Sequence, residues 1–263
     1  EYAVPFGATS IDVVFNNGSG TWDNNNGMDW HLPVAEGEPG PAEFVIDGNL
    51  DSGAQIAAAT TITLWADWNG TDLYVATENP SGSDRFIFVA GTPGTLTTAP
   101  WAKSGQVAGW SAYLAEEESN GWNGWFDQSA VVANTSGAVL EGTINLLQEI
   151  GSDVASVWIC LGAYATADGG ALTAQAPAAV IANGNIEASE WVELILRPDS
   201  LVITVSGNDV NLSWSPVFGA DAYRIYLRTE SDGEVVDVFE SSTTNYILPL
   251  TYSTAFFEVR ARF

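Results

Sequence analysis

Residues 62–77 read ITLWADWNGTDLYVAT, and their pattern decides the fold class. Apolar and polar side chains alternate from Ile62 to Trp68, which is the period of a β-strand with one buried face. Asn69-Gly70 is a typical turn pair, and a second apolar run follows it from Leu73 to Thr77. The stretch therefore predicts a strand, a turn and a second strand.

The same alternation recurs along the chain, for example from Val210 to Trp214, between segments rich in Gly, Asn, Asp, Pro and Ser. Helical patterns are short, and the best of them cover Gly109 to Glu118 and Leu146 to Gly151. We therefore expect an all-β protein built of tandem β-sandwiches. The apolar run Val157 to Leu161 should be a buried strand that holds the only cysteine, Cys160, which has no partner for an internal disulfide.

Two shifts in composition divide the chain. The run EGEPGP at residues 36–41 cannot continue a β-ladder and predicts a linker over residues 36–42. The run RPD at residues 197–199 follows a strand-like stretch and marks the second boundary. The predicted parts are a β-hairpin segment at 1–35, a β-sandwich at 43–196 and a second sandwich at 197–263.

The charge of the chain is strongly negative. Thirty-three acidic residues against seven basic ones give a formal net charge of −26 over 263 residues. Such a field repels phosphate backbones and anionic lipid headgroups, so nucleic acid is not an expected partner. The richest apolar stretch, Val154 to Ala165, is too short to cross a bilayer, so direct membrane insertion is not expected either. Cations and neutral ligands remain.

The central part carries three motifs of one family. They are DGNLD at 47–51, LWADWNGTDLYVAT at 64–77 and LEGTINL at 140–146. Together they resemble the β-sandwich of family 9 carbohydrate-binding modules and DOMON-like domains, over most of residues 43–196. The resemblance implies a jelly-roll sandwich. Members of that group bind sugars, haem or calcium or are purely structural, so the fold names no ligand.

Two cofactors of that group can be weighed against the residues. Haem is not expected, because its axial ligands are usually His or Met and the only ones here, His31 and Met28, lie outside the central part. Calcium is a candidate cofactor, since Asp47, Asn49 and Asp51 alternate as oxygen ligands would. The site would not be an EF-hand, because no Glu stands eleven residues after Asp47. The alternative is that these side chains cap turns.

The N-terminal segment places aromatic rings among short amides and carboxylates. Residues 15–27 read FNNGSGTWDNNNG and closely resemble the C-terminal hairpin of the starch-binding modules of carbohydrate-binding families 25 and 26. That resemblance implies that Trp22 contributes to an α-glucan platform. Ring faces stack on the C–H faces of sugars, while Asn and Asp bond their hydroxyls. The candidate sugar-binding residues of this segment are Trp22, Asn24, Asn25, Asn26, Asp29 and Trp30. Alternatively, the two Trp rings pack in a core and the Asn run forms turns.

A second candidate platform lies at residues 116–126, which read EEESNGWNGWF. Trp122 and Trp125 stand there in a Gly- and Asn-rich loop flanked by acidic residues. Aromatic rings on such a loop bind sugars or serve as hot spots for a protein partner. The alternative is that the loop folds over the sandwich and buries both rings.

The C-terminal part resembles a fibronectin type III domain. Residues 210–226 read VNLSWSPVFGADAYRIY and closely resemble its strands B and C, and residues 256–263 resemble its strand F. The resemblance implies that Trp214 and Tyr223 are core residues and that the module is a spacer or an adhesion unit. No match to the last strand of that domain follows, so we expect an open sheet edge.

These observations favour a binding protein over an enzyme. One His and one cysteine exclude most nucleophilic triads and His-rich metal sites. The first hypothesis is a non-catalytic, secreted or cell-surface protein that binds an α-glucan-type polysaccharide. The alternative is a structural subunit whose open strands pair with other copies to build a fibre, tube or surface layer, with calcium as a candidate requirement.

Overall fold

The computed structural model divides the chain by its internal contacts into two units, Glu1–Pro41 and Ala42–Phe263. The described residues are 10–13, 15–16, 22–23, 30–33, 43–78, 82–126, 132–136, 138–151, 154–198, 200–231, 233–249, 251–252 and 254–263. The first unit holds two antiparallel strand pairs. They are β1 (Ser10–Val13) with β4 (Trp30–Pro33), and β2 (Phe15–Asn16) with β3 (Trp22–Asp23).

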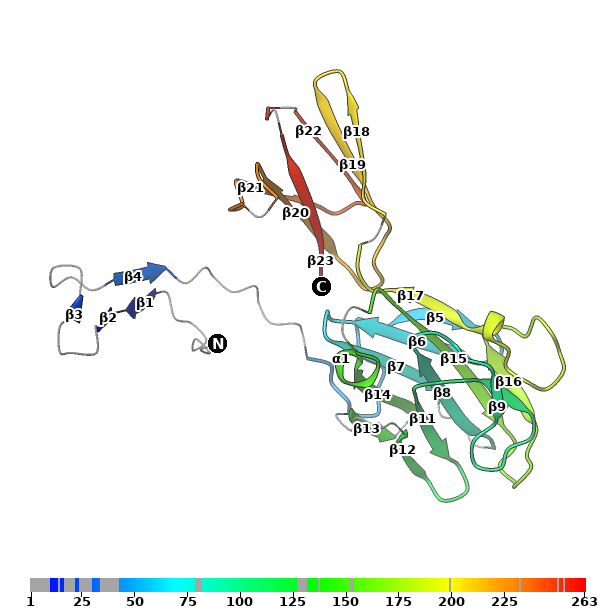
Figure 1. Ribbon diagram of the computed structural model, residues 1–263. Coiled ribbons are helices and arrows are strands. Elements are labelled where there is room, and N and C mark those ends of the chain that lie inside the picture. Colours follow the sequence, from blue (N-terminus) through cyan, green and yellow to red (C-terminus); the bar gives the residue numbers. More distant parts are fainter. Residues whose placement is uncertain are drawn as a thin grey trace. The chain divides into compact units, whose positions relative to one another are not determined.

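The second unit contains a sandwich of two antiparallel sheets within residues 43–196 (Figure 1). One sheet has the strand order β13-β14-β7-β6-β5, and the other has the order β12-β11-β8-β15-β16, with β17 also paired to β15. The strands of the first sheet are β5 (Gln55–Ala59), β6 (Thr63–Trp68), β7 (Asp72–Glu78), β13 (Val132–Ser136) and β14 (Val139–Asn145). Those of the second are β8 (Asp84–Ala90), β11 (Ala112–Glu117), β12 (Trp122–Phe126), β15 (Ser156–Tyr164), β16 (Leu172–Ala176) and β17 (Val192–Ile195).

The alternation seen in the sequence sets which side chains face the middle of the sandwich. Along β6 every second residue is buried, as predicted, and Leu64 and Ala66 face the core between the two sheets. The central strand β8 differs because it is buried on both faces. Ile87 and Val89 enter the core between the sheets, whereas Phe86 and Phe88 enter a second core on the outer face of the same sheet. Loops and short elements must therefore cover that outer face.

The cover of the outer face consists of irregular segments and two short strands, β9 (Leu96–Thr98) and β10 (Gln106–Ala108), which pair antiparallel. A 3₁₀ turn, η2 (Ala188–Glu190), precedes β17. Val107, Ile186 and Trp191 from these segments are buried against the second core. The sandwich thus has a third, loop-built layer, and the candidate site described below lies in it.

The two helical candidates had different outcomes. The pattern at Gly109 to Glu118 does not form a helix, in line with the all-β prediction, because Ala112–Glu117 is the strand β11, held between β8 and β12. Its apolar residues alternate between the two cores, with Leu114 in one and Tyr113 in the other, so packing overrides a weak helical pattern. Leu146–Glu149 does form the short helix α1, whose N-cap is the side chain of Asn145.

Cys160 lies in the middle of β15 and is fully buried, as predicted. Burial raises the pKa of its thiol well above the ordinary value, and the nearby Glu190 carboxylate adds to this. The thiolate, which is the reactive form of a cysteine, is therefore disfavoured.

The C-terminal module, residues 197–263, has two three-stranded antiparallel sheets, with the strand orders β18-β19-β22 and β21-β20-β23. The strands are β18 (Val202–Ser206), β19 (Asp209–Ser213), β20 (Ala222–Arg228), β21 (Asp237–Ser241), β22 (Asn245–Pro249) and β23 (Phe256–Arg262). Trp214 and Tyr223 are buried in its core, and their rings meet edge to face. The prediction that both are core residues is confirmed.

The fold class is therefore all-β with sandwich architecture, as the sequence predicted. Within the part of the chain that the structure describes, no helix is long and apolar enough to cross a membrane.

Candidate functional site

A pocket of about 330 Å³ opens in the loop layer of the sandwich. It combines aromatic rings with carboxylate, amide and hydroxyl groups. Its lining residues are Asp84, Trp101, Lys103, Glu117, Asn120, Trp122, Phe126, Thr166 and Asp168. They come from the start of β8, the β9–β10 connection, the β11–β12 hairpin and the loop after β15.

Three rings form the apolar wall of this pocket. The ring centroid of Trp101 lies 5.6 Å from that of Trp122 and 5.7 Å from that of Phe126. Trp122 and Phe126 are 5.2 Å apart and keep 40% and 38% of their surface exposed. At these separations the rings touch one another and leave no gap for a ligand to enter between them. They form one continuous aromatic surface, which we call the ring wall (Trp101, Trp122 and Phe126).

The strand β12 separates the two tryptophans of the predicted platform. Trp122 and Phe126 lie on the pocket face, as does Gly124, where a Cβ atom would come 2.7 Å from the Trp122 ring. Glycine at this position therefore lets the indole lie against the strand. Trp125 is on the opposite face and packs against the core between the sheets. Of the predicted pair, only Trp122 belongs to the exposed site.

Trp101 reaches the ring wall from a strained turn. Its φ is +52° and that of the next residue, Ala102, is +53°, a left-handed conformation that costs free energy for residues other than glycine. Two backbone hydrogen bonds hold the turn in place. The N–H of Lys103 donates to the carbonyl of Pro100 (3.1 Å), and the N–H of Gly169 donates to the carbonyl of Ala102 (3.0 Å). The surrounding structure therefore fixes the position of this ring.

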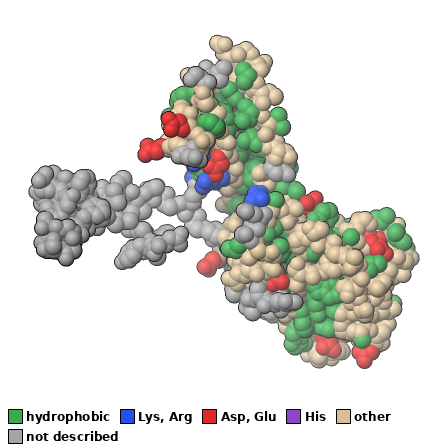
Figure 2. Space-filling view, in the orientation of Figure 1, with side chains coloured by type: hydrophobic (Ala, Val, Ile, Leu, Met, Phe, Trp, Pro, Cys, Tyr) green, Lys and Arg blue, Asp and Glu red, His purple; other side chains and the backbone are tan. Residues whose placement is uncertain are grey.

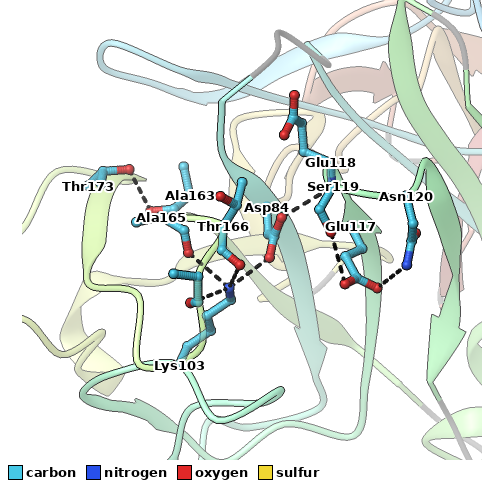
Figure 3. A network of polar contacts seen from close by, with 11 residues as sticks. Asp84, Lys103, Glu117, Glu118, Ser119, Asn120, Ala163, Ala165, Thr166 and Thr173 are labelled. Atoms are coloured by element: carbon cyan, nitrogen blue, oxygen red, sulfur yellow. Dashed lines mark hydrogen bonds and ion pairs between the residues drawn. The ribbon is translucent and has the colours of Figure 1, made fainter.

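Lys103, the only lysine of the chain, holds this turn in place through the contacts of its side chain (Figure 3). Lys103 Nζ donates to the carbonyl oxygens of Ala165, Thr166 and Ala167 at 2.8, 3.0 and 3.1 Å. It also lies 2.7 Å from the Oδ2 atom of Asp84, and both side chains are 2% exposed. Four oxygen atoms thus surround one buried ammonium group. A buried charge is stable only when it is paired and hydrogen-bonded in this way.

Asp84 extends the same network to the β11–β12 hairpin. Its Oδ1 atom accepts a hydrogen bond from the N–H of Glu118 at 3.1 Å, while Oδ2 faces Lys103. One buried ion pair therefore joins the strained turn, the hairpin and the loop after β15 (Figure 3). Together with the start of β8, which carries Asp84, these three segments build the pocket.

The polar rim of the pocket is organised within the hairpin. The Glu117 carboxylate accepts hydrogen bonds from Asn120 Nδ2 (2.8 Å) and Ser119 Oγ (3.2 Å). Asn120 Oδ1 in turn accepts from the N–H of Trp122 at 2.8 Å. Asp168, in the loop after β15, adds another carboxylate to the lining. The rim therefore offers mainly hydrogen-bond acceptors beside an apolar wall.

Behind the rim lies a buried carboxyl with a changed acidity. Burial raises the pKa of Glu116 to about 7. The acidic groups Asp84, Glu118 and Glu117 raise it further, and Arg85, its cross-strand partner on β8, opposes them. Glu116 alternates with Glu117 along β11, so its side chain is on the face of the strand that also carries Leu114, opposite the rim.

The predicted N-terminal platform is only partly within the described residues. Trp22 lies on β3, opposite Asn16, and Trp30 lies on β4, opposite Val13. The four other predicted residues, Asn24, Asn25, Asn26 and Asp29, lie outside the described residues. Sugar binding by this segment stays a prediction.

The candidate calcium ligands take part in local hydrogen bonds. Asp47 Oδ1 accepts from the N–H and the side-chain amide of Asn49, and Asp51 accepts from the N–H groups of Val45 and Gly53. These are turn-capping contacts. Within the described ranges no group of three or more His, Cys, Asp or Glu side chains could hold a metal ion, and calcium binding stays an untested prediction.

The DGNLD motif is held by a residue of another strand. Glu141, on β14, is fully buried, and its Oε1 accepts hydrogen bonds from the N–H groups of Asp47 (2.7 Å) and Gly48 (2.5 Å). Its Oε2 accepts from the Tyr74 hydroxyl at 2.6 Å. The motif thus anchors the start of the sandwich to its first sheet.

Of the nine lining residues, sequence reasoning singled out only Trp122 as a site residue. It missed Asp84, Trp101, Lys103, Glu117, Asn120, Phe126, Thr166 and Asp168. The available signal was the triplet Trp101-Ala102-Lys103, since a single lysine in a chain with 33 acidic residues is unusual. The partners of Lys103 are backbone carbonyls some 60 positions later in the chain, and no sequence pattern marks them.

Comparisons with known proteins do not assign the chain to a family. No protein-family model matches it, and no curated protein matches its sequence. A crystal structure of a β-1,2-glucanase from Parabacteroides distasonis matches 89% of this chain and 32% of its own length, at 16% identity and a TM-score of 0.19. This chain therefore spans about a third of that glucanase. A likeness this low carries no argument about fold or activity.

The buried ion pair makes the first testable prediction. Replacing Lys103 with Met leaves the Asp84 carboxylate buried without its counter-charge, so the free energy of unfolding should fall by about 3–5 kcal/mol. Urea denaturation measures this change. Arg260→Met, which also removes one positive charge but from a side chain 59% exposed, should cost less than about 1 kcal/mol. If the two variants were equally stable, the Asp84–Lys103 pair would make no special contribution to the stability of the fold.

The raised pKa of Glu116 gives the second testable prediction. Its folded-state pKa is above the ordinary value, so its favourable contribution is fully present below about pH 4.5 and is lost as the pH rises through about 7. The Glu116→Gln variant should therefore gain stability relative to the wild type between pH 5 and pH 8. Thermal unfolding at several pH values measures the difference. Glu43→Gln, which removes one carboxylate at an exposed position, serves as the matched control.

Proposed function

We propose that this protein is a non-catalytic, secreted or cell-surface protein that binds an α-glucan-type polysaccharide through the pocket beside the ring wall. The observation that carries the proposal is the pairing of an exposed aromatic surface with a rim of fixed acceptors. Sugars present an apolar C–H face and a belt of hydroxyl groups, and these are the two features that such a pocket complements.

Preorganisation supports the proposal. The Asp84–Lys103 pair joins the turn that carries Trp101 to two other segments. The pocket is therefore already ordered, and little conformational entropy is lost when a ligand binds. The charge of the lining favours neutral sugars over anionic ones. Glu117 and Asp168 line the pocket, and the ammonium group of Lys103 is already surrounded by four oxygen atoms.

The choice of an α-glucan rests on a different part of the chain. It comes from the resemblance of residues 15–27 to starch-binding modules, and the pocket itself favours only an uncharged glycan. The same resemblance supports a secreted or cell-surface location, because modules of that kind act on extracellular polysaccharides. The two candidate platforms can be separated by substitution.

The third prediction concerns retention on insoluble starch, with cellulose and xylan tested in parallel. Removing the exposed indole with Trp122→Ala should weaken binding by about 2 kcal/mol, or roughly thirtyfold, because ring contacts dominate such sites. Trp125→Phe, on the other face of β12, should bind as the wild type does. Loss of binding only in Trp22→Ala would move the site to the first unit. Background retention of the wild type on all three polymers would contradict the proposed function.

A second candidate function is self-assembly by strand pairing, and one observation favours it. In the C-terminal module, Ile203 and Val205 on β18 are 48% and 60% exposed. They share a face with their register partners Leu212 and Val210, which are buried. Across the module, β23 pairs only with β20 among the described strands. An added strand could therefore cover apolar side chains that already point to the core.

The fourth prediction tests this candidate by negative-stain microscopy with and without calcium. If strand pairing builds assemblies, the wild type should form fibres, tubes or layers, and Ile203→Lys/Val205→Lys should abolish them. Thr204→Lys/Ser206→Lys adds the same charge to the opposite face of β18 and should leave them intact. Monodisperse particles under both conditions would contradict self-assembly by this route.

A further inference from the structure

The strand β18 is an open sheet edge in the C-terminal module. Among the strands whose burial the structure describes, it is the one in which every residue is exposed. Within the described strands it pairs only with β19, so no strand lies beside the backbone N–H and C=O groups on its other side. Figure 2 shows hydrophobic side chains at many places on the visible face of this module. The edge can therefore accept another strand.

The core-facing side of β18 carries apolar side chains that the module leaves partly uncovered. Ile203 and Val205 are 48% and 60% exposed. Their register partners on β19, Leu212 and Val210, are buried. Leu201, two positions before Ile203, packs partly buried against the same core. Three apolar residues at alternate positions thus lie on one face of an open edge.

The edge is uncharged, although the chain as a whole is strongly acidic. Residues 200–208 contain no acidic or basic side chain, whereas the formal net charge of the chain is −26. Charged side chains on edge strands are one of the means by which proteins prevent pairing with another chain, and β18 has none. Two such edges can also meet without placing like charges opposite each other, which would be destabilising.

An antiparallel copy of the same strand complements this edge. When Ile203 lies opposite Ile203 of a second copy, the antiparallel register places Leu201 opposite Val205 of that copy, and the reverse. All three apolar positions then meet apolar positions on the core-facing side. A register centred on Thr204 would instead place Leu201 opposite Gly207, and a shift by one residue would set core-facing residues against outward-facing ones. The register centred on Ile203 therefore covers the most apolar surface.

We infer that β18 pairs antiparallel with β18 of a second copy of this chain, with Ile203 on the two-fold axis. The contact joins the sheets β18-β19-β22 of the two copies into one continuous sheet. Because both copies use the same surface, the contact is isologous and ends at a dimer. The inference rests on the second candidate function and names its partner strand. Fibres, tubes or layers then require a further contact besides this one.

Cysteine crosslinking of the full chain tests the register. Diamide oxidises two neighbouring thiols to a disulfide, which forms only where the two Cα atoms are about 4–7 Å apart. Ile203→Cys should give a covalent dimer on a denaturing gel, and so should an equimolar mixture of Val202→Cys and Thr204→Cys. Each of the last two should stay monomeric alone, because its two copies lie on diagonal positions about 7–8 Å apart. The native Cys160 is fully buried, so it does not compete.

Ile56→Cys is the matched control for random collision. Ile56 is also an exposed isoleucine on an edge strand, β5, and it is 63% exposed. It should give no covalent dimer under the same conditions, and crosslinking equal to that of Ile203→Cys would overturn the inference. Val202 and Thr204 are exposed outward-facing residues, so their substitution leaves the core of the module intact. Efficient crosslinking of either variant alone would overturn the proposed register.

Sedimentation velocity of the wild type separates this inference from the candidate function on which it rests. Because both copies are strongly negative, we expect the dimer to be about tenfold tighter at about 500 mM NaCl than at about 20 mM, where repulsion is less screened. A wild type that is monomeric at both salt concentrations would overturn both the inference and self-assembly by strand pairing. A wild type that associates while Ile203→Cys forms no covalent dimer would overturn only the pairing of β18 with itself.

Discussion

A buried ion pair between Asp84 and Lys103 is the constraint on which the candidate site depends. Removing an ammonium group from water is costly, and this one is stable only because a carboxylate and three backbone carbonyls surround it. All of these partners must be in place together, so the turn at Trp101 and the loop at residues 165–167 cannot shift independently. The geometry of the pocket is therefore a property of the folded core rather than of separate loops.

The two faces of one sheet explain where that network could form. The strand β6 buries one of its faces, whereas β8 buries both, since Phe86 and Phe88 enter a second core on the outer face. The segments that cover this second core bring polar backbone close to apolar rings. Asp84 is the first residue of β8, at the edge of the covered region, where a carboxylate can reach both the hairpin and the lysine. The polar groups of the candidate site thus lie at the edge of the second core, beside the segments that cover it.

Short-range patterns predicted much of the fold, and long-range contacts account for what they missed. The strands at Ile62 to Trp68 and the core positions of Trp214 and Tyr223 follow from alternation and turn residues. In the stretch WNGWF, however, Trp122 and Trp125 look equivalent, and only the pairing of β12 with β11 decides which one is exposed. The turn at Trp101 was not predicted because distant carbonyl groups stabilise its left-handed backbone.

The burial of Lys103 also has a practical side. It is the only lysine in the sequence and 4% exposed, so reagents that acylate lysine side chains find no accessible target on the folded protein. Crosslinkers and dyes that couple to lysine side chains would leave the pocket chemically unaltered. A lysine introduced at a chosen surface position would accordingly serve as a single attachment point, and the site of conjugation could be set by design rather than by chance.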